Sequence, residues 1–309
     1  MEFTRDLVLD EQEESTDLRL NYLSETLADA LQECLSTDSN RVTFVTGGDH
    51  PRLVSAPLSV ARVLAPVWNA QTAILTSATI PQSLPHRLGL AVDNDTRLEV
   101  ESPFDYEANA LLYLADDLPD PDAPDRNQKV HARIRQLVQY SDGSALVLFT
   151  SRKAMRDAVD ELRGTLDDIT VLSQDDMGKK ALLDAFKTDI RSCLFATRSF
   201  FQGVDVPGDA LRLVILDKVP FPMRTDPLLE ARRDLLGQSA FMQIDVPIAA
   251  ATLAQAAGRL IRSATDHGVV AILDSRLVKR RYKGAVLEGV AHFPETSQLD
   301  DVKSFFHRR

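Results

Sequence analysis

An amide and two guanidinium groups lie at helical spacing in the segment QAAGRLIR, residues 255–262. Gln255, Arg259 and Arg262 are separated by four and then three residues, so in a helix their side chains project from one face. Guanidinium groups stay charged and bind phosphate oxygens through paired hydrogen bonds. With the small Gly258 beside them, these groups predict a phosphate clamp. The alternative is a solvated basic helix face on which the two arginines are incidental.

A second candidate is the loop SFFQGVDVPG, residues 199–208, which follows an apolar run. Gly203 and Gly208 allow a ligand to approach the backbone closely, and Asp205 can accept hydrogen bonds or orient a water near a phosphate or Mg²⁺. The alternative is a tight crossover loop in which Asp205 caps a turn. The two adjacent phenylalanines are more typical of a core than of a platform for stacking bases.

Hydroxyl side chains end two further apolar runs. Ser77 and Thr79 lie in LTSATI, and Thr150, Ser151 and Arg152 lie in VLFTSR. Such residues most often cap the following helix. In the second segment, the backbone N–H groups of a helix N-terminus and Ser151 can also hold a nucleic-acid phosphate. Both interpretations stay open.

The apolar pattern predicts the elements that bring these segments together. Strands are expected at 145–150, 169–172, 193–197, 211–216 and 269–274, and helices at 126–140, 152–167, 179–187, 227–237 and 247–263. This alternation is typical of an α/β fold with a parallel sheet and helices on both faces. In such sheets ligands bind at the carboxyl ends of the strands.

The chain before residue 126 follows another pattern. It predicts an amphipathic helix from residue 15 to Cys34, two strands at 41–46 and 52–57 around a turn, and a buried-type strand at 72–76. The acidic, proline-rich stretch 116–125 is typical of a linker or surface loop. We therefore predict a remnant of a preceding domain at 1–80, a connector at 81–125 and the α/β domain at 126–309.

Composition narrows the class of protein further. The chain has 309 residues and a net charge of −11, which argues against a surface that binds nucleic acid everywhere. Residues 1–150 carry 11 Lys and Arg against 24 Asp and Glu, whereas residues 151–309 carry 24 against 22. A polyanion site is therefore expected in the second half.

Metal and membrane classes are also disfavoured. Cys34 and Cys193 stand alone, which excludes a disulfide framework or a cysteine-rich zinc or iron–sulfur site, and both are expected as small buried hydrophobes. The histidines are scattered and suggest no metal site. No apolar run is long enough to span a membrane, and the acidic start lacks the features of a secretory signal. We expect a cytoplasmic protein.

In this order, the segments resemble the second motor domain of superfamily 2 helicases of the XPD/DinG type, and bacterial DinG-like members most closely. LTSATI is similar to motif III, LVLFTSRKAM to motif IV, SFFQGVDVPG with LRLVILDKVPF to motif V and its extension, and QAAGRLIR with GVVAILDSR to motif VI and its closing strand. The segment ESPFDY is similar to the family's entry into that domain. The resemblance implies a RecA-like sheet of the P-loop NTPase type.

The resemblance implies roles at the matching positions. Arg259 and Arg262 would be arginine fingers that reach the γ-phosphate of ATP, and Gln255 would position the attacking water or the phosphate. The positions expected around the nucleotide are Gln202, Gly203, Asp205 and Gly258. Members of the family often have Glu at the position of Gln202. Gln202 can still form hydrogen bonds there, but it cannot play a role that needs a carboxylate. Residues expected to bind DNA or to couple it to hydrolysis are Ser77, Thr79, Thr150, Ser151, Arg152 and Arg198.

The sequence contains no GxxxxGK(S/T) phosphate loop and no DEAH-type acidic box. In the family these elements, and an iron–sulfur cluster in some members, lie before motif III in the first motor domain. The chain therefore resembles the carboxyl-terminal part of a DNA helicase, with 5′ to 3′ polarity by family resemblance. Its partners would be single-stranded DNA, ATP with Mg²⁺ and the missing first motor domain.

Alone, the chain is expected neither to hydrolyse ATP nor to unwind DNA. Two alternatives stay open. One is a non-catalytic nucleic-acid-binding or regulatory module with a helicase-like fold. The other is an unrelated doubly wound enzyme that binds a small phosphorylated ligand.

Overall fold

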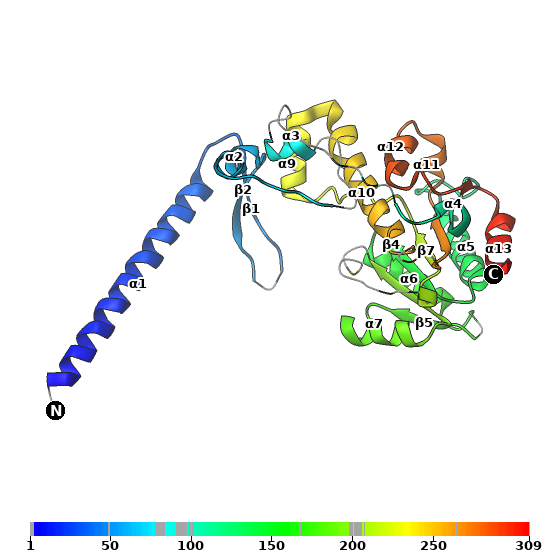
Figure 1. The fold of residues 1–309 in the computed structure, drawn as a ribbon, viewed down its shortest axis with the longest axis horizontal. Helices are drawn as coiled ribbons and strands as arrows, with labels where there is room; N and C mark the ends of the chain where they lie inside the picture. Colours follow the sequence, from blue (N-terminus) through cyan, green and yellow to red (C-terminus); the bar gives the residue numbers. More distant parts are fainter. Residues whose placement is uncertain are drawn as a thin grey trace. The chain divides into compact units, whose positions relative to one another are not determined.

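A computed structural model describes residues 3–48, 50–77, 84–90, 98, 100, 102–166, 168–197, 200, 206, 208–261, 263 and 265–308. The chain divides into two compact units, each of which gathers segments that are far apart in the sequence (Figure 1). The first comprises Met1–Leu75, Gln82–Asp95 and Arg224–Gly237, and the second comprises Thr76–Pro81, Thr96–Met223 and Gln238–Arg309.

The first unit contains a long helix, a β-hairpin and shorter helices. Its elements are α1 (Phe3–Leu35), β1 (Arg41–Val45), β2 (Leu53–Pro57), α2 (Ala61–Ala70), α3 (Leu84–Leu88) and α9 (Pro227–Leu236). β1 and β2 pair antiparallel, with Arg41 opposite Pro57, which confirms the predicted hairpin. The Nε atom of Arg232 donates to the carbonyl of Leu58 at 2.8 Å, so α9 is held to a residue 174 positions earlier.

Two details of this unit differ from the sequence prediction. The strand expected at 72–76 has no strand partner among the described residues, and Ile74 is 86% exposed. An extended segment without a neighbour leaves its ladder hydrogen bonds unmade, so an apolar run alone does not make a strand. The first helix begins at Phe3, well before residue 15. Its acidic beginning favours a helix although it carries no apolar stripe.

Within the described residues, the second unit is built around a parallel sheet of seven strands. They are β3 (Ala110–Leu114), β4 (Ala145–Phe149), β5 (Thr170–Ser173), β6 (Ser192–Thr197), β7 (Leu213–Leu216), β8 (Gly268–Ile272) and β9 (Glu295–Thr296). The strands lie in the order β5-β6-β4-β7-β8-β3-β9, and each neighbouring pair is parallel. The predicted α/β class with a parallel sheet is confirmed.

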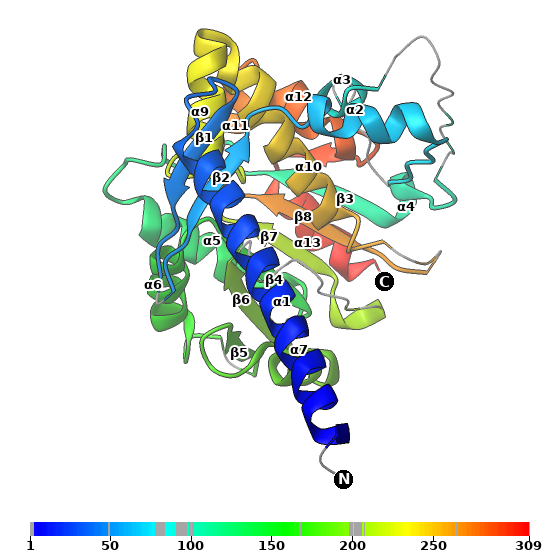
Figure 2. The ribbon, with the colours of Figure 1, turned by 90° about the vertical axis from the view of Figure 1, so that its left-hand side faces the viewer.

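Helices cover both faces of the sheet (Figures 1 and 2). Alternate strand residues point to opposite faces, so Leu146 joins one core and Val147 the other. The first core packs against α7 (Lys179–Thr188), α10 (Val246–Ala257) and α12 (Lys283–Leu287), and the second against α5 (Arg126–Tyr140), α6 (Arg152–Leu162) and α13 (Leu299–His307). Cys193 is buried in the second core as predicted, whereas Cys34 on α1 is half-buried.

The remaining described elements are short. They are α4 (Tyr106–Asn109), α11 (Ser275–Lys279), the 3₁₀ turns η2 (Gly208–Ala210), η3 (Gly237–Ser239) and η5 (Glu288–Val290), and the π-helical segment η4 (Phe241–Asp245). Across the described ranges, no helix is both long enough and apolar enough to cross a membrane.

Two boundaries in the second unit differ from the sequence prediction. β3 lies inside the expected connector 81–125, so the sheet begins before residue 126 and the acidic, proline-rich stretch is a loop within the unit. α10 ends at Ala257 rather than near residue 263, with Gly258 as its C-cap. Glycine weakens a helix. Beyond it the chain turns more tightly, and the Leu260 N–H donates to the Ala257 carbonyl at 2.9 Å.

Candidate functional site at the strand ends

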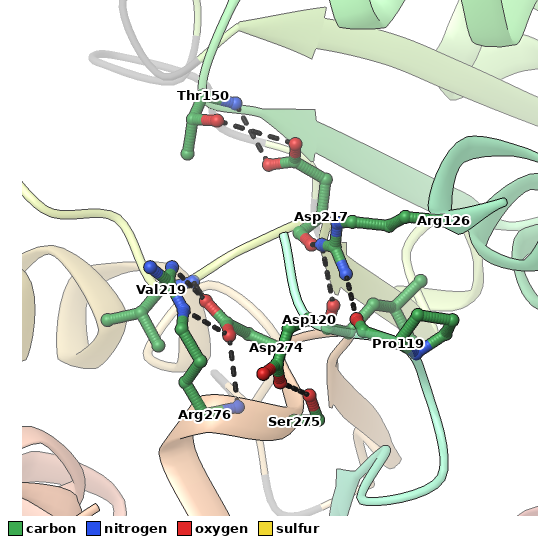
Figure 3. A network of polar contacts seen from close by, with 10 residues as sticks. Pro119, Asp120, Arg126, Thr150, Asp217, Val219, Asp274, Ser275 and Arg276 are labelled. Atoms are coloured by element: carbon green, nitrogen blue, oxygen red, sulfur yellow. Dashed lines mark hydrogen bonds and ion pairs between the residues drawn. The ribbon is translucent and has the colours of Figure 1, made fainter. Parts of the chain in front are cut away.

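Three neighbouring strands, β4, β7 and β8, end at one edge of the sheet, and polar residues follow each of them. Thr150 follows β4 directly, Asp217 follows β7 directly, and Asp274 follows β8 after one apolar residue. Asp217 is 3% exposed and Asp274 is 1% exposed. Because the carboxyl ends of parallel strands form the ligand sites of α/β sheets, this edge is the candidate site. Figure 3 shows its polar contacts.

The turn between β4 and α6 carries two of the predicted residues. Ser151 is the N-cap of α6, and its hydroxyl accepts a hydrogen bond from the Ala154 N–H at 3.1 Å. Thr150 donates its N–H to Asp217 Oδ1 at 2.9 Å and its hydroxyl to Asp217 Oδ2 at 3.4 Å. The capping interpretation of Ser151 is confirmed. The same turn presents the positive end of the α6 dipole, which favours an anion.

Arg152, the third predicted residue of this turn, shares a carboxylate with a second arginine. Its guanidinium donates to Asp175 Oδ1 at 2.7 Å, and Arg156 Nε donates to Asp175 Oδ2 at 2.6 Å. Hydrogen bonds from Arg156 and Arg152 hold the pKa of Asp175 below its usual value. The arginine side chains are 62% and 60% exposed. The cluster therefore presents a net positive charge at the start of α6. Arg156 was missed in the sequence, although it lies one helical turn after Arg152.

Asp217 is a buried carboxylate that receives hydrogen bonds from the neighbouring strand end. Burial raises its pKa to about 6, although the Lys218 charge, the Thr150 hydrogen bonds and the Arg126 charge act in the opposite direction. Its own N–H donates to the carbonyl of Leu148 at 3.0 Å. Asp217 thus joins the ends of β4 and β7 through both its backbone and its side chain.

Asp274 has the same place on the next strand but a different partner. The Arg276 side chain binds it through two hydrogen bonds, from Nε to Oδ1 at 2.9 Å and from Nη2 to Oδ2 at 2.7 Å. The Val219 N–H donates to Asp274 Oδ2 at 3.1 Å. Burial by itself would raise the pKa of Asp274, but the hydrogen bonds and charge of Arg276 outweigh it and hold the pKa below its usual value.

Arg126 closes this network from the first residue of α5. It is 2% exposed, and its Nη2 atom donates to the backbone carbonyls of Asp217 at 2.8 Å and Leu273 at 3.0 Å. Its Nη1 atom donates to the carbonyl of Pro119 at 3.2 Å. Burial lowers the pKa of Arg126 from its usual value. The sequence prediction treated Arg126 only as a helix start, because its acceptors come from segments far away in the chain.

The helix expected to carry the predicted phosphate clamp is shorter than predicted. Because α10 ends at Ala257, Gln255 lies on the helix and Arg259 lies in the turn beyond it. Gln255 is exposed and Arg259 is half-buried. The Arg259 N–H donates to the Ala256 carbonyl at 3.2 Å. The turn starts at the exposed Gly258, and glycine allows the close approach predicted for this position.

A small cavity lies between α10 and the ends of β4 and β7. Its volume is about 20 Å³ and it is lined by Leu148, Phe149, Thr150, Leu216, Lys218, Pro220, Thr252 and Ala256. That is room for about one water, far below the roughly 300–1,000 Å³ that encloses a small ligand. This cavity does not enclose a nucleotide.

Several predicted residues lie outside the part of the chain that the structure describes: Thr79, Arg198, Gln202, Gly203, Asp205 and Arg262. Ser77 is described and exposed, and it follows the extended segment 72–76. Phe200 is half-buried against the first core, as expected for this residue, and Phe201 lies outside the described residues. No group of three or more potential metal ligands occurs within the described residues.

Comparison with protein families matches residues 134–293 to the helicase C-terminal domain. The ATP-dependent helicase DinG of Mycobacterium tuberculosis is 38% identical over 265 residues, and the ATP-dependent DNA helicase YoaA of Escherichia coli is 38% identical over 260 residues. The matches cover 82% and 81% of this chain and 40% of each relative. The chain thus spans about two-fifths of the length of these relatives.

A third relative has a different name, the 3′-5′ exonuclease DinG of Bacillus subtilis. It is 30% identical over 262 residues, which is 79% of this chain and 28% of that protein. Among solved structures, an XPD helicase matches with a TM-score of 0.62 at 15% identity, over 83% of this chain and 48% of the other. S. tokodaii Xpd4 matches with a TM-score of 0.54 at 18% identity, over 80% and 48%. These structures show that the fold is RecA-like.

Proposed function

The chain belongs to the helicase C-terminal domain family, with DinG and YoaA helicases among its relatives, and we propose that it is the second motor domain of an ATP-dependent DNA helicase. One observation carries the proposal. The turn from Thr150 to Arg152 and the end of β7 lie at one edge of a RecA-like sheet, beneath the helix that leads to Arg259. Strand ends are where such a sheet binds its ligands.

We propose that the β4–α6 turn contacts a phosphate of single-stranded DNA. The α6 N-terminus, Arg152 and Arg156 supply positive charge there, and phosphate contacts of this kind need no base sequence. Ser77, Thr79 and Arg198 are further proposed DNA or coupling contacts, by their positions in the family motifs.

For ATP, we propose that Arg259 and Arg262 act as arginine fingers and that Gln255 positions the attacking water. ATP with Mg²⁺ would be held mainly by a first motor domain, since this sequence contains no GxxxxGK(S/T) phosphate loop and no DEAH-type acidic box. α10 ends at Gly258, directly before Arg259. Gln202, Gly203 and Asp205 stay proposed contacts between the nucleotide and the DNA track. Any iron–sulfur cluster would belong to the missing part.

The finger proposal is tested in the parent protein, by which we mean the longer helicase of which this chain would be a part. Arg259→Ala should lower DNA-stimulated ATP hydrolysis by about 1,000-fold or more, because a lost finger leaves transition-state charge unstabilised. ATP binding, measured with a fluorescent analogue, should stay largely intact. The matched control is Arg135→Ala on the exposed side of α5. Undiminished turnover in Arg259→Ala would contradict the assignment.

The isolated chain offers a second test. We expect weak binding to a single-stranded oligonucleotide that falls steeply with salt, as phosphate contacts release counterions. We expect no ATP hydrolysis, and in the parent protein 5′ to 3′ movement and a cytoplasmic location. Salt-insensitive binding would indicate a dry, specific pocket instead of a phosphate track.

One observation favours a second candidate, a non-catalytic nucleic-acid-binding module. The Bacillus subtilis relative is named an exonuclease, so this kind of domain occurs in a protein named for another activity. A parent protein that binds DNA but shows no DNA-stimulated ATP hydrolysis would favour that candidate. The alternative of an unrelated small-ligand enzyme is not supported, because the chain belongs to the helicase family.

A further inference from the structure

Hydrogen bonds cross the sheet edge in one direction, from each strand end to the next (Figure 3). β8, β7 and β4 are consecutive neighbours in the sheet. Asp274, after β8, accepts from the N–H of Val219 in the loop after β7 at 3.1 Å. Asp217, after β7, accepts from the N–H of Thr150 in the turn after β4 at 2.9 Å. Each aspartate therefore holds the backbone of the neighbouring loop.

These contacts fix backbone positions rather than side chains. At Asp217, where Thr150 donates to both carboxylate oxygens, a backbone N–H that turned away would leave its acceptor unsatisfied, which costs more than an ordinary hydrogen bond. At Asp274, Arg276 still binds both oxygens, so the same movement would lose one hydrogen bond. Arg126 adds to this by holding the carbonyls of Asp217 and Leu273 together from the same guanidinium nitrogen. The loops that follow β4, β7 and β8 are thus held in fixed positions relative to one another.

We propose that Asp217 and Asp274 form a relay that positions the Thr150–Ser151 turn for its DNA phosphate. The inference rests on the proposed function, because it requires that this turn contacts DNA. Both aspartates are positioning residues, since at 3% and 1% exposure neither can reach DNA itself. Asp217 is the last member of the relay and should have the larger effect.

The first experiment uses the 309-residue chain and a fluorescent oligothymidylate of about one binding-site length. Asp217→Asn should weaken binding about tenfold, because a neutral amide oxygen accepts the Thr150 N–H more weakly than a carboxylate does. Loss of a negative charge by itself would strengthen binding to a polyanion. The sign of the effect therefore separates positioning from long-range charge. Asp300→Asn, at an exposed site on α13, makes the same charge change and should not weaken binding.

The second experiment tests whether the two aspartates act in series. Asp274→Asn should weaken binding by about threefold, and the double variant should weaken binding, relative to the unaltered chain, by less than the product of the two single effects. Effects that multiply would show that the two sites act separately, which overturns the relay.

A pH titration of the unaltered chain keeps the test independent of variants that fail to fold. The charged groups that face Asp217 are Lys218 from its own loop and Arg126 from α5, while α10 faces the adjoining cavity with Thr252 and Ala256. Protonation near the Asp217 pKa of about 6 removes acceptor capacity, so DNA affinity should fall about tenfold between pH 7.5 and 5. Asp217→Asn should show no such fall.

Affinity that is unchanged in Asp217→Asn and constant over this pH range would overturn the relay but leave the proposed function standing. A chain that does not bind single-stranded DNA at any salt concentration would overturn both.

Discussion

Asp217 and Asp274 occupy equivalent places at the ends of adjacent parallel strands, yet burial has opposite outcomes for them. Both are almost wholly buried, and both accept a backbone N–H from the next loop. The pKa of Asp217 is raised to about 6, whereas that of Asp274 is held below its usual value. The difference lies in the cation. Arg276 binds both oxygens of Asp274, while Arg126 binds the carbonyl of Asp217.

The comparison shows that the partner of a buried carboxylate decides its charge more than its burial does. An arginine on the carboxylate oxygens offsets the desolvation of the charge, whereas backbone N–H and hydroxyl groups offset it only in part. The β8 end is therefore a fixed ion pair. The β7 end titrates close to neutral pH.

The largest expected effect comes from removing the cation that distinguishes the two sites. Arg276→Met leaves the Asp274 carboxylate buried without its pair and should lower the free energy of unfolding by about 4 kcal/mol at pH 7. Urea unfolding followed by circular dichroism measures it. Arg280→Met, at an exposed position in the same region, should change the free energy by less than about 0.5 kcal/mol. A loss below about 1 kcal/mol for Arg276→Met would show that the pair is not what separates the sites.

A pH series sharpens the comparison, because the two aspartates should give opposite slopes. The folded pKa of Asp217 is raised from 3.8 to about 6. Its contribution to stability is therefore complete below the unfolded pKa and is lost as pH rises through about 6, a change of about 3 kcal/mol. The lowered pKa of Asp274 gives stability that is present above the unfolded pKa and is lost as pH falls.

The measurement is the free energy of unfolding between pH 3 and 7.5 for the unaltered chain, Asp217→Asn and Asp274→Asn. As pH rises, the free energy of unfolding of Asp217→Asn should increase relative to that of the unaltered chain. That of Asp274→Asn should decrease relative to the unaltered chain. Equal slopes for both variants would refute the contrast.

The smallest expected effect comes from replacing Arg126, which donates hydrogen bonds to carbonyls at the ends of both β7 and β8. Arg126→Met leaves the carbonyls of Asp217, Leu273 and Pro119 without this donor and should lower the free energy of unfolding by about 2 kcal/mol. It should also raise the pKa of Asp217 further, since a nearby positive charge is lost. Arg135→Met on the same helix is the control, and the pH series reports the pKa change. An effect equal to that of the control would show that Arg126 is dispensable.

The local pattern of the sequence was enough for most of the sheet and its helices. The helix 126–140 has the predicted bounds, and five predicted strands lie within a few residues of β4, β5, β6, β7 and β8. Apolar runs and amphipathic spacing are local properties, so they can be recognised without knowing which strands pair. β3 was missed because it lies beside the acidic, proline-rich loop, where composition indicated a connector.

The site was less accessible to prediction. Thr150, Ser151 and Arg152 lie at a strand end as expected, whereas α10 ends before Arg259, inside the helix predicted at 247–263. The two buried aspartates had a visible signal, since both follow an apolar run that ends in Ile-Leu-Asp. Their hydrogen bonds depend on the strand order, which no local pattern contains.

The position of β3 also determines when the sheet can form during synthesis. Residues 110–114 pair with residues 268–272 of β8 and with residues of β9. β3 is the first strand of the sheet to leave the ribosome, but both of its neighbours are among the last. At about 5–20 residues per second, its apolar side chains wait some 10–30 s for their partners. During that interval β3 is an apolar strand without its neighbours, and unpaired strands of this kind are prone to aggregation.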